Sequence, residues 1–155
     1  MKKLEMKYKK IFLILLGIII VFLDQITKYT LMGKNLTIIP NILNFTYTEN
    51  TGVAFGIGAN NIFLTIIVNI IVLGVIIDCI RKNQTDFKIL IPLVLIFSGG
   101  VGNLIDRIFR GYVIDFIDIN LFNFPNFNIA DICITTGIIF LITIIIKLTK
   151  NDTEK

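Results

Sequence analysis

Histidine and tryptophan are absent from this 155-residue sequence, and cysteine and proline are scarce, with two and three residues. Without histidine the chain cannot form Ser-His or Cys-His nucleophilic pairs, HExxH zinc sites or imidazole proton relays. Its two cysteines, Cys79 and Cys133, do not make a disulfide framework. Any acid–base chemistry near neutral pH must therefore come from carboxylates with shifted pKa values, or from lysine, tyrosine or a thiol.

Charge is scarce as well. Charged residues make up 17% of the chain and hydrophobic residues 55%, and the mean hydropathy is +0.83. Soluble domains are nearer to about a quarter charged. The net charge of +4 does not indicate nucleic-acid binding, because the lysines cluster at the ends of apolar runs. We therefore expect one integral membrane domain over residues 1–155, without a nucleic-acid partner.

Four apolar segments predict an all-α membrane protein with four transmembrane helices. They cover about residues 11–31, 62–80, 89–105 and 132–148. Each approaches the length that a hydrocarbon core of about 30 Å requires. The first segment could be mistaken for a secretory signal, but no small-residue cleavage site follows it. We therefore expect it to be a retained helix.

The distribution of lysine and arginine predicts the direction of these spans. Eleven of the 15 cationic residues lie in the N-terminal tail, the 81–88 loop and the C-terminal segment. The two other loops hold the remaining four, which are Lys28, Lys34, Arg107 and Arg110. Because cytoplasmic segments carry the excess of positive charge, both termini are expected to be cytoplasmic. Cys79 and Cys133 would then lie at opposite faces, too far apart for a disulfide.

Two segments outside the spans are predicted to be extended. Within residues 36–58, Leu43, Phe45 and Tyr47 alternate with polar residues, which is the period of a half-buried strand. This indicates a small β element on the outer face. In residues 113–118 an extended chain would point Asp118 away from Asp115, whereas a helix would place them side by side. We favour the extended conformation.

Polar residues gather at the outer ends of the predicted spans. Ionisable groups at membrane depth cost roughly 2.5–3.5 kcal/mol each, so a convergent set indicates a functional site. Asp24 and Lys28 are four residues apart on one helix, where their side chains can meet. The others are Asn103, Asp106, Arg107, Asp115, Asp118, Asn128 and Asp131.

Several of these residues also have a purely structural interpretation. Asp24–Lys28 fits an ion pair that lets the first helix end inside protein, and Asp106–Arg107 fits a scaffold role because arginine clamps carboxylates. Ser98, Gly99, Gly100 and Gly102 are typical of close helix packing. Asn69 is expected to form an interhelical hydrogen bond.

Asp115 and Asp131 are the best candidates for chemistry. Asp115 lies in an apolar stretch with no cation of its own. Asp131 opens the last helix, where it could also act only as an N-terminal cap. Two carboxylates brought together cannot both ionise easily, so one is expected to hold a proton. Asp115 is expected to hold this proton, because desolvation among apolar neighbours disfavours its ionised form. Such a pair can hydrolyse a peptide bond with water.

Five motifs in this order resemble those of the bacterial lipoprotein signal peptidases (signal peptidase II). They are 24–28 (DQITK), 49–55 (ENTGVAF), 99–107 (GGVGNLIDR), 113–118 (VIDFID) and 127–131 (FNIAD). Each motif alone is weak, but the five occur in the right order on the right sides of four spans. One departure is Val53, which stands where the family usually has alanine.

The resemblance implies an aspartic endopeptidase of the bacterial plasma membrane with its active site at the outer face. Asp115 and Asp131 would be the catalytic dyad, and a β-cradle would help to hold the substrate. Supporting residues would be Asp24, Lys28, Asn50, Gly52, Asn103, Asp106, Arg107, Asn128 and Ala130. The substrates would be prolipoproteins cut before a diacylglyceryl cysteine. We expect a monomer in membrane lipid that needs no metal and no cofactor.

Two other classes of protein are compatible with the same residues. A small proton-coupled transporter could use the acidic groups as a proton path, but no inverted repeat or broken mid-membrane helix is visible in the sequence. In a non-catalytic membrane scaffold the aspartates and arginines would only form ion pairs. Loss of peptide cleavage in a folded Asp115→Asn protein would separate an enzyme from both.

Overall fold

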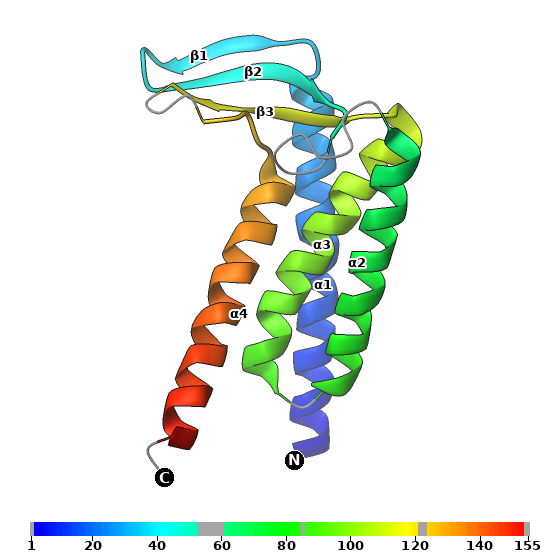
Figure 1. Cartoon of the computed structure of the whole chain (residues 1–155), viewed down its shortest axis with the longest axis vertical. Helices are drawn as coiled ribbons and strands as arrows, with labels where there is room; N and C mark the ends of the chain where they lie inside the picture. The colour runs from blue at the N-terminus through cyan, green and yellow to red at the C-terminus, as the bar shows by residue number, and fades with distance from the viewer. Residues whose placement is uncertain (1, 53–60, 85, 121–123, 154–155) are drawn as a thin grey trace.

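The computed structural model describes residues 2–52, 61–84, 86–120 and 124–153. Its four helices are α1 (Lys2–Leu31), α2 (Ile62–Lys82), α3 (Phe87–Arg110) and α4 (Ile129–Thr153). All four are long and apolar enough to cross a membrane. They run side by side, and the two termini lie at the end of the bundle opposite the sheet (Figure 1). The predicted fold class, four membrane helices with a small β element, is confirmed.

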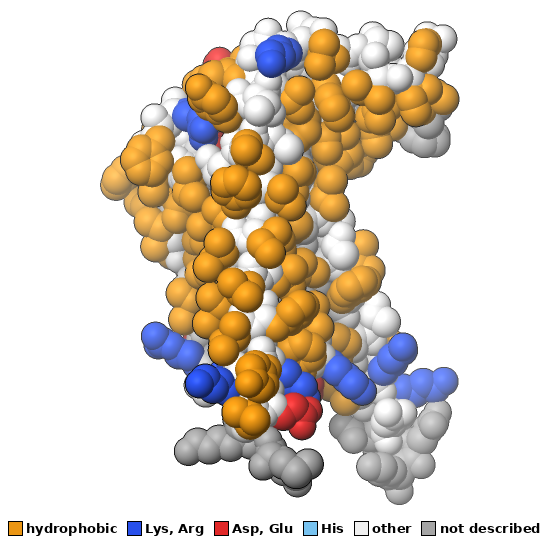
Figure 2. Space-filling view, turned by 180° about the vertical axis from the view of Figure 1, so that it is seen from behind, with side chains coloured by type: hydrophobic (Ala, Val, Ile, Leu, Met, Phe, Trp, Pro, Cys, Tyr) orange, Lys and Arg blue, Asp and Glu red, His pale blue; other side chains and the backbone are white. Residues whose placement is uncertain are grey.

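The outside of the bundle is apolar. Exposed isoleucine, leucine and phenylalanine side chains cover the described faces of α1, α2 and α4, and Ile18, Phe63 and Ile146 are each about 60–70% exposed. Lysine and arginine side chains form a band around the end of the bundle away from the sheet (Figure 2). In water such a surface would aggregate, whereas in a bilayer it faces acyl chains and headgroups.

Helix α3 packs against each of the other three helices. It carries more buried residues than any other described helix, among them Leu90, Leu93, Ser98 and Gly99. A Cβ atom on Gly99 would lie 2.4 Å from the carbonyl oxygen of Ala130, and one on Gly102 would lie 2.5 Å from the carboxylate of Asp24. The predicted close packing at these glycines is therefore confirmed. Asn69 donates a hydrogen bond from α2 to the carbonyl of Gly100 at 3.3 Å, as expected.

A three-stranded antiparallel sheet lies across one end of the bundle (Figure 1). Strands β1 (Asn35–Ile39) and β2 (Leu43–Asn50) form a hairpin that connects to α1, and β3 (Val113–Ile119) lies between α3 and α4. The hairpin turns at Asn41, whose φ of 61° is one that asparagine tolerates. Both predicted extended segments are strands, although residues 53–58 of the first lie outside the described part of the chain.

Strand β3 fixes the sheet to the bundle. The backbone N–H of Ile114 donates to the carboxylate of Asp106 on α3 at 3.2 Å. Farther along, Ile117 exchanges backbone hydrogen bonds of 2.8 and 3.1 Å with Phe127, just before α4. Between Phe45 and Thr48 the β2–β3 register contains an irregularity, so Thr48 pairs with Asp115. Side chains of β3 are thereby held between the sheet and the helix ends.

Candidate active site

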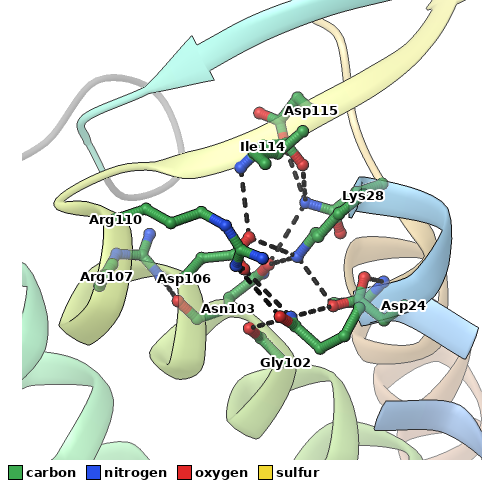
Figure 3. A network of polar contacts seen from close by, with 12 residues as sticks. Asp24, Lys28, Gly102, Asn103, Asp106, Arg107, Arg110, Ile114 and Asp115 are labelled. Carbon is green, nitrogen blue, oxygen red and sulfur yellow. Dashed lines mark hydrogen bonds and ion pairs between the residues drawn. The ribbon is translucent and has the colours of Figure 1, made fainter. Parts of the chain in front are cut away.

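A buried ammonium group stands at the centre of the polar cluster (Figure 3). The Nζ atom of Lys28 lies 2.8 Å from the carboxylate of Asp24, 2.9 Å from that of Asp106 and 2.9 Å from the amide oxygen of Asn103. Lys28, Asp24 and Asp106 are all fully buried. Charges this deep are tolerated only when they are paired and hydrogen-bonded, so each member of the cluster depends on the others.

Two residues of this cluster, Gln25 and Arg110, are missing from the set predicted from the sequence. Arg110 pairs with the carboxylate of Asp106. Gln25 donates to the carboxylates of Asp24 and Asp106 at 3.1 and 3.0 Å, and its amide oxygen accepts from Arg110 at 3.1 Å. The spacing of four residues between Asp106 and Arg110 on one helix was a usable signal. No comparable signal pointed to Gln25, because Asp106 and Arg110 lie on another helix.

The cluster also reaches the beginning of α4. Asp24 accepts a hydrogen bond of 2.9 Å from the backbone N–H of Ala130. That N–H belongs to the first turn of α4, where backbone donors have no partner within the helix. The carboxylate therefore stabilises the helix N-terminus while it ties α1 to α4. Ala130 is itself fully buried, and the predicted pairing of Asp24 with Lys28 is present.

Asn128 and Asp131 cap α4 reciprocally. The side-chain oxygen of Asn128 accepts from the backbone N–H of Asp131 at 2.9 Å, and the carboxylate of Asp131 accepts from the backbone N–H of Asn128 at 3.2 Å. This arrangement is a capping box. The other oxygen of Asp131 accepts from the amide of Asn103 at 2.8 Å. Capping is thus part of the role of Asp131, and its side chain is still half-buried and reaches toward α3.

Asp115 projects from β3 into the space above the helix ends and is only 2% exposed. Its two carboxylate oxygens accept hydrogen bonds from Asn128 at 2.6 Å and from Asn50 at 2.9 Å. Burial and, to a smaller extent, the nearby charge of Asp131 raise the pKa of Asp115 to about 6, while the two amides and Lys28 oppose the rise. The direction of this shift is the one expected for the carboxyl group that takes up the proton more readily.

Arg107 and Gly52 close one side of the site. The Arg107 guanidinium donates to the carbonyl of Gly52 at 2.8 Å, and the N–H of Gly52 donates to Asn50 at 3.0 Å. Among the buried side-chain nitrogens and oxygens that the structure describes, Nε of Arg107 alone has no partner. Residues 53–55 of the predicted 49–55 motif, including Val53, lie outside the described residues.

Asp118 lies on the other side of β3 from Asp115. Its carboxylate accepts from the hydroxyl of Thr46 at 2.9 Å and lies 3.5 Å from the amide of Asn44. The extended conformation predicted for this segment is therefore the observed one, and Asp118 belongs to the sheet rather than to the cluster. The other eleven predicted residues lie in one continuous network that joins α1, β2, β3, α3 and α4. Asn128 and Asn103 link its two halves.

The fold and this network together define a class: a polytopic membrane protein whose ionisable groups converge where its spans meet a small extramembrane sheet. Residues 16–147 match the family model for signal peptidase (SPase) II. The chain belongs to the signal peptidase II family. Lipoprotein signal peptidases of Staphylococcus aureus strains JH9 and Newman are each 39% identical to it, and these matches cover 96% of this chain and 98% of the relative.

Solved structures support the same assignment. One bacterial membrane enzyme determined by the in meso method at 2.3 Å resolution superposes with a TM-score of 0.84 at 36% identity, and the match covers 92% of each chain. A second, at 1.9 Å resolution, gives a TM-score of 0.78 at 35% identity and covers 87% of this chain and 92% of the other. Family membership favours a peptidase over the transporter and scaffold alternatives.

Proposed function

We propose that this protein is a lipoprotein signal peptidase of the aspartic type. It removes the signal peptide from diacylglyceryl-modified prolipoproteins by cutting before the lipidated cysteine. The family and the name of the staphylococcal relatives support the reaction. The observation that carries the catalytic type is the bonding of both Asp115 and Asp131 to one residue, Asn128, at the sheet end of the bundle.

The two carboxyl groups take different roles because their surroundings differ. Asp115 is buried and its pKa is raised to about 6, so it holds a proton more readily than an ordinary aspartic acid. Asp131 lies in the first turn of α4, where the helix N-terminus stabilises a negative charge. Asp131 is therefore the base and Asp115 the acid. A pair divided in this way can activate water and polarise a carbonyl in the same step.

The hydrolysis balances with water alone. Asp131 takes a proton from the water while the water oxygen bonds to the scissile carbonyl carbon. Asp115 gives its proton to the carbonyl oxygen. When the tetrahedral intermediate collapses, the C–N bond breaks and the amine nitrogen receives the proton from Asp131, while Asp115 recovers its own. Both groups return to their starting states, so neither a metal nor a cofactor is required.

The remaining predicted site residues act as positioning residues. Asn50 and Asn128 orient the carboxyl of Asp115, and Asn103 orients that of Asp131. Lys28 in turn orients Asn103 by donating a hydrogen bond to its amide oxygen. Five more complete the support: Asp24, Asp106, Ala130, Arg107 and Gly52.

The membrane setting follows from charge. The end opposite the sheet carries the band of lysine and arginine side chains (Figure 2), and this charge supports a cytoplasmic location for that end and for both termini in a bacterial cell. The site then lies at the outer face of the plasma membrane. A signal peptide and two acyl chains partition into lipid, so a monomer receives its substrate by lateral diffusion.

The test is cleavage of a prolipoprotein by detergent-purified protein, with the same precursor offered with and without its diacylglyceryl group. We expect cleavage of the lipidated precursor, with the new N-terminus at the modified cysteine, and no product from the unlipidated one. Equal cleavage of both precursors would contradict the proposed requirement for the diacylglyceryl group. Cleavage at another bond would contradict the site of cutting.

A further inference from the structure

A groove of about 880 Å³ begins at the end of the bundle opposite the sheet and runs toward the site as far as Phe22 on α1 and Val101 on α3. Its apolar wall comes from one face of α1, including Ile14 and Ile18, and one face of α3, including Val94 and Phe97. Lys10 and Arg81 line it where α1 and α2 reach the band of positive charge. We call it the α1–α3 groove.

The dimensions of the groove suit one lipid chain. Lining residues of α1 run from Lys10 to Phe22, and the helical rise gives this stretch a length of about 18 Å. Half of a hydrocarbon core of about 30 Å is close to this length. Apart from Ser98, the lining away from the charged end is apolar. A chain that enters at the charged end therefore finds a matching wall over the depth of one leaflet.

The charges at the mouth of the groove lack carboxylate partners. Nearby acids are already engaged: Glu5 binds Lys9 at 2.6 Å, and Asp78 binds Lys82 at 2.5 Å. Asp86 caps α3 by accepting from a backbone N–H at 3.0 Å. Within the described part of the chain, Lys10 and Arg81 form no ion pair. Two free cations beside an apolar groove complement an anionic headgroup joined to an acyl chain.

We infer that the α1–α3 groove binds one anionic phospholipid, with its phosphate between Lys10 and Arg81 and one acyl chain against α1 and α3. The inference does not rest on the proposed function. A signal peptide is a poorer occupant, because its n-region carries positive charge and would meet two cations at this end. The two carboxylates of the candidate site lie at the other end of the bundle.

Native mass spectrometry of the detergent-purified full-length protein tests this site. The probes are phosphatidylglycerol and phosphatidylcholine with the same acyl chains. We expect one phosphatidylglycerol to bind with at least about tenfold higher affinity than phosphatidylcholine. Replacing both cations (Lys10→Gln with Arg81→Gln) should weaken phosphatidylglycerol binding by about 10- to 30-fold. The control Lys7→Gln with Lys147→Gln removes the same charge at the same end outside the groove and should change it by less than about twofold.

A second pair of variants tests the apolar wall. Ile14 lines the groove and is 62% exposed, so Ile14→Trp fills it without displacing packed neighbours. Ile19→Trp adds the same bulk to an exposed position on α1 outside the lining. We expect Ile14→Trp alone to reduce phosphatidylglycerol retention. Three outcomes would each overturn the inference. The first is equal binding of both lipids, and the second is an equal effect of each variant and its control. The third is a protein dimer that disappears with Ile14→Trp.

Discussion

At the residue scale, Asp115 and Asp131 share Asn128 as a neighbour but sit in different surroundings. One is buried in a strand and the other is half-buried in the first turn of a helix. Replacing either by asparagine removes a proton carrier with little change of volume. We expect Asp115→Asn and Asp131→Asn each to abolish cleavage of a lipidated prolipoprotein. The unfolding free energy should fall by no more than about 1–3 kcal/mol, since one accepted hydrogen bond is lost at each position, and the one at Asp131 is made by a charged group. Turnover within a few-fold of wild type in either variant would refute the dyad.

The same two residues determine the pH dependence. Below about pH 6 Asp115 keeps the proton that it donates, and above that pH it loses it. The value of kcat/KM should therefore fall as the pH rises through about 6. It should also fall at low pH, where the pair takes up a second proton. Steady-state kinetics across pH, with a check that the protein stays folded at each value, measure both limbs. A profile without a falling limb on the alkaline side would contradict the role of Asp115 as the acid.

Lys28 offers a stability prediction at the same scale. It is fully buried between Asp24 and Asp106, so Lys28→Met leaves two buried carboxylates with less compensation. Removing one partner from a buried ion pair typically costs about 3–5 kcal/mol, and we expect a loss of this size in thermal or denaturant unfolding. Lys34→Met is the control, because Lys34 is an exposed cation at the same end of the bundle. Equal stabilities of the two variants would mean that the cluster is not a structural centre.

At the scale of elements, β3 separates the two aspartates of the 113–118 motif. Asp115 faces the helix ends, and Asp118 bonds to Thr46 within the sheet. Asp118→Asn should therefore keep cleavage activity within about tenfold of wild type, since the amide oxygen can still accept from the Thr46 hydroxyl. The comparison with Asp115→Asn in the same assay makes the contrast sharp. Complete inactivity of a folded Asp118→Asn protein would show that both faces of β3 take part.

Elements also show why some of the site could be predicted from the sequence and some could not. Hydropathy and length identify four spans, and a spacing of four residues identifies the Asp24–Lys28 pair. Gln25 escaped because its bonds to Asp106 and Arg110 exist only after α1 has packed against α3. The hydrogen bond of Asn128 to Asp115 depends in the same way on where β3 meets α4. Contacts between elements carry no local signal, and the family motifs were needed to include such residues.

At the scale of the whole molecule, the bundle has two chemically different ends. The sheet end holds the buried ion cluster and the two carboxyl groups, and the other end holds unpaired cations beside an apolar groove. Between them the described helices expose a belt of aliphatic and aromatic side chains. This polarity sets the orientation that we propose, and it places the charged mouth of the lipid groove at the end away from the two carboxyl groups.

The sheet is assembled from two distant parts of the chain, since β1 and β2 precede α2 whereas β3 follows α3. Asn50 therefore meets Asp115 only after the third span has crossed the membrane and β3 has joined its partner strand. Lys28 likewise meets its partners Asp106 and Asn103 only after α3 has been inserted. During biogenesis the nascent chain thus carries an incomplete site until its second half has been inserted. A partly synthesised enzyme is consequently inactive toward precursors that emerge from the same translocation machinery.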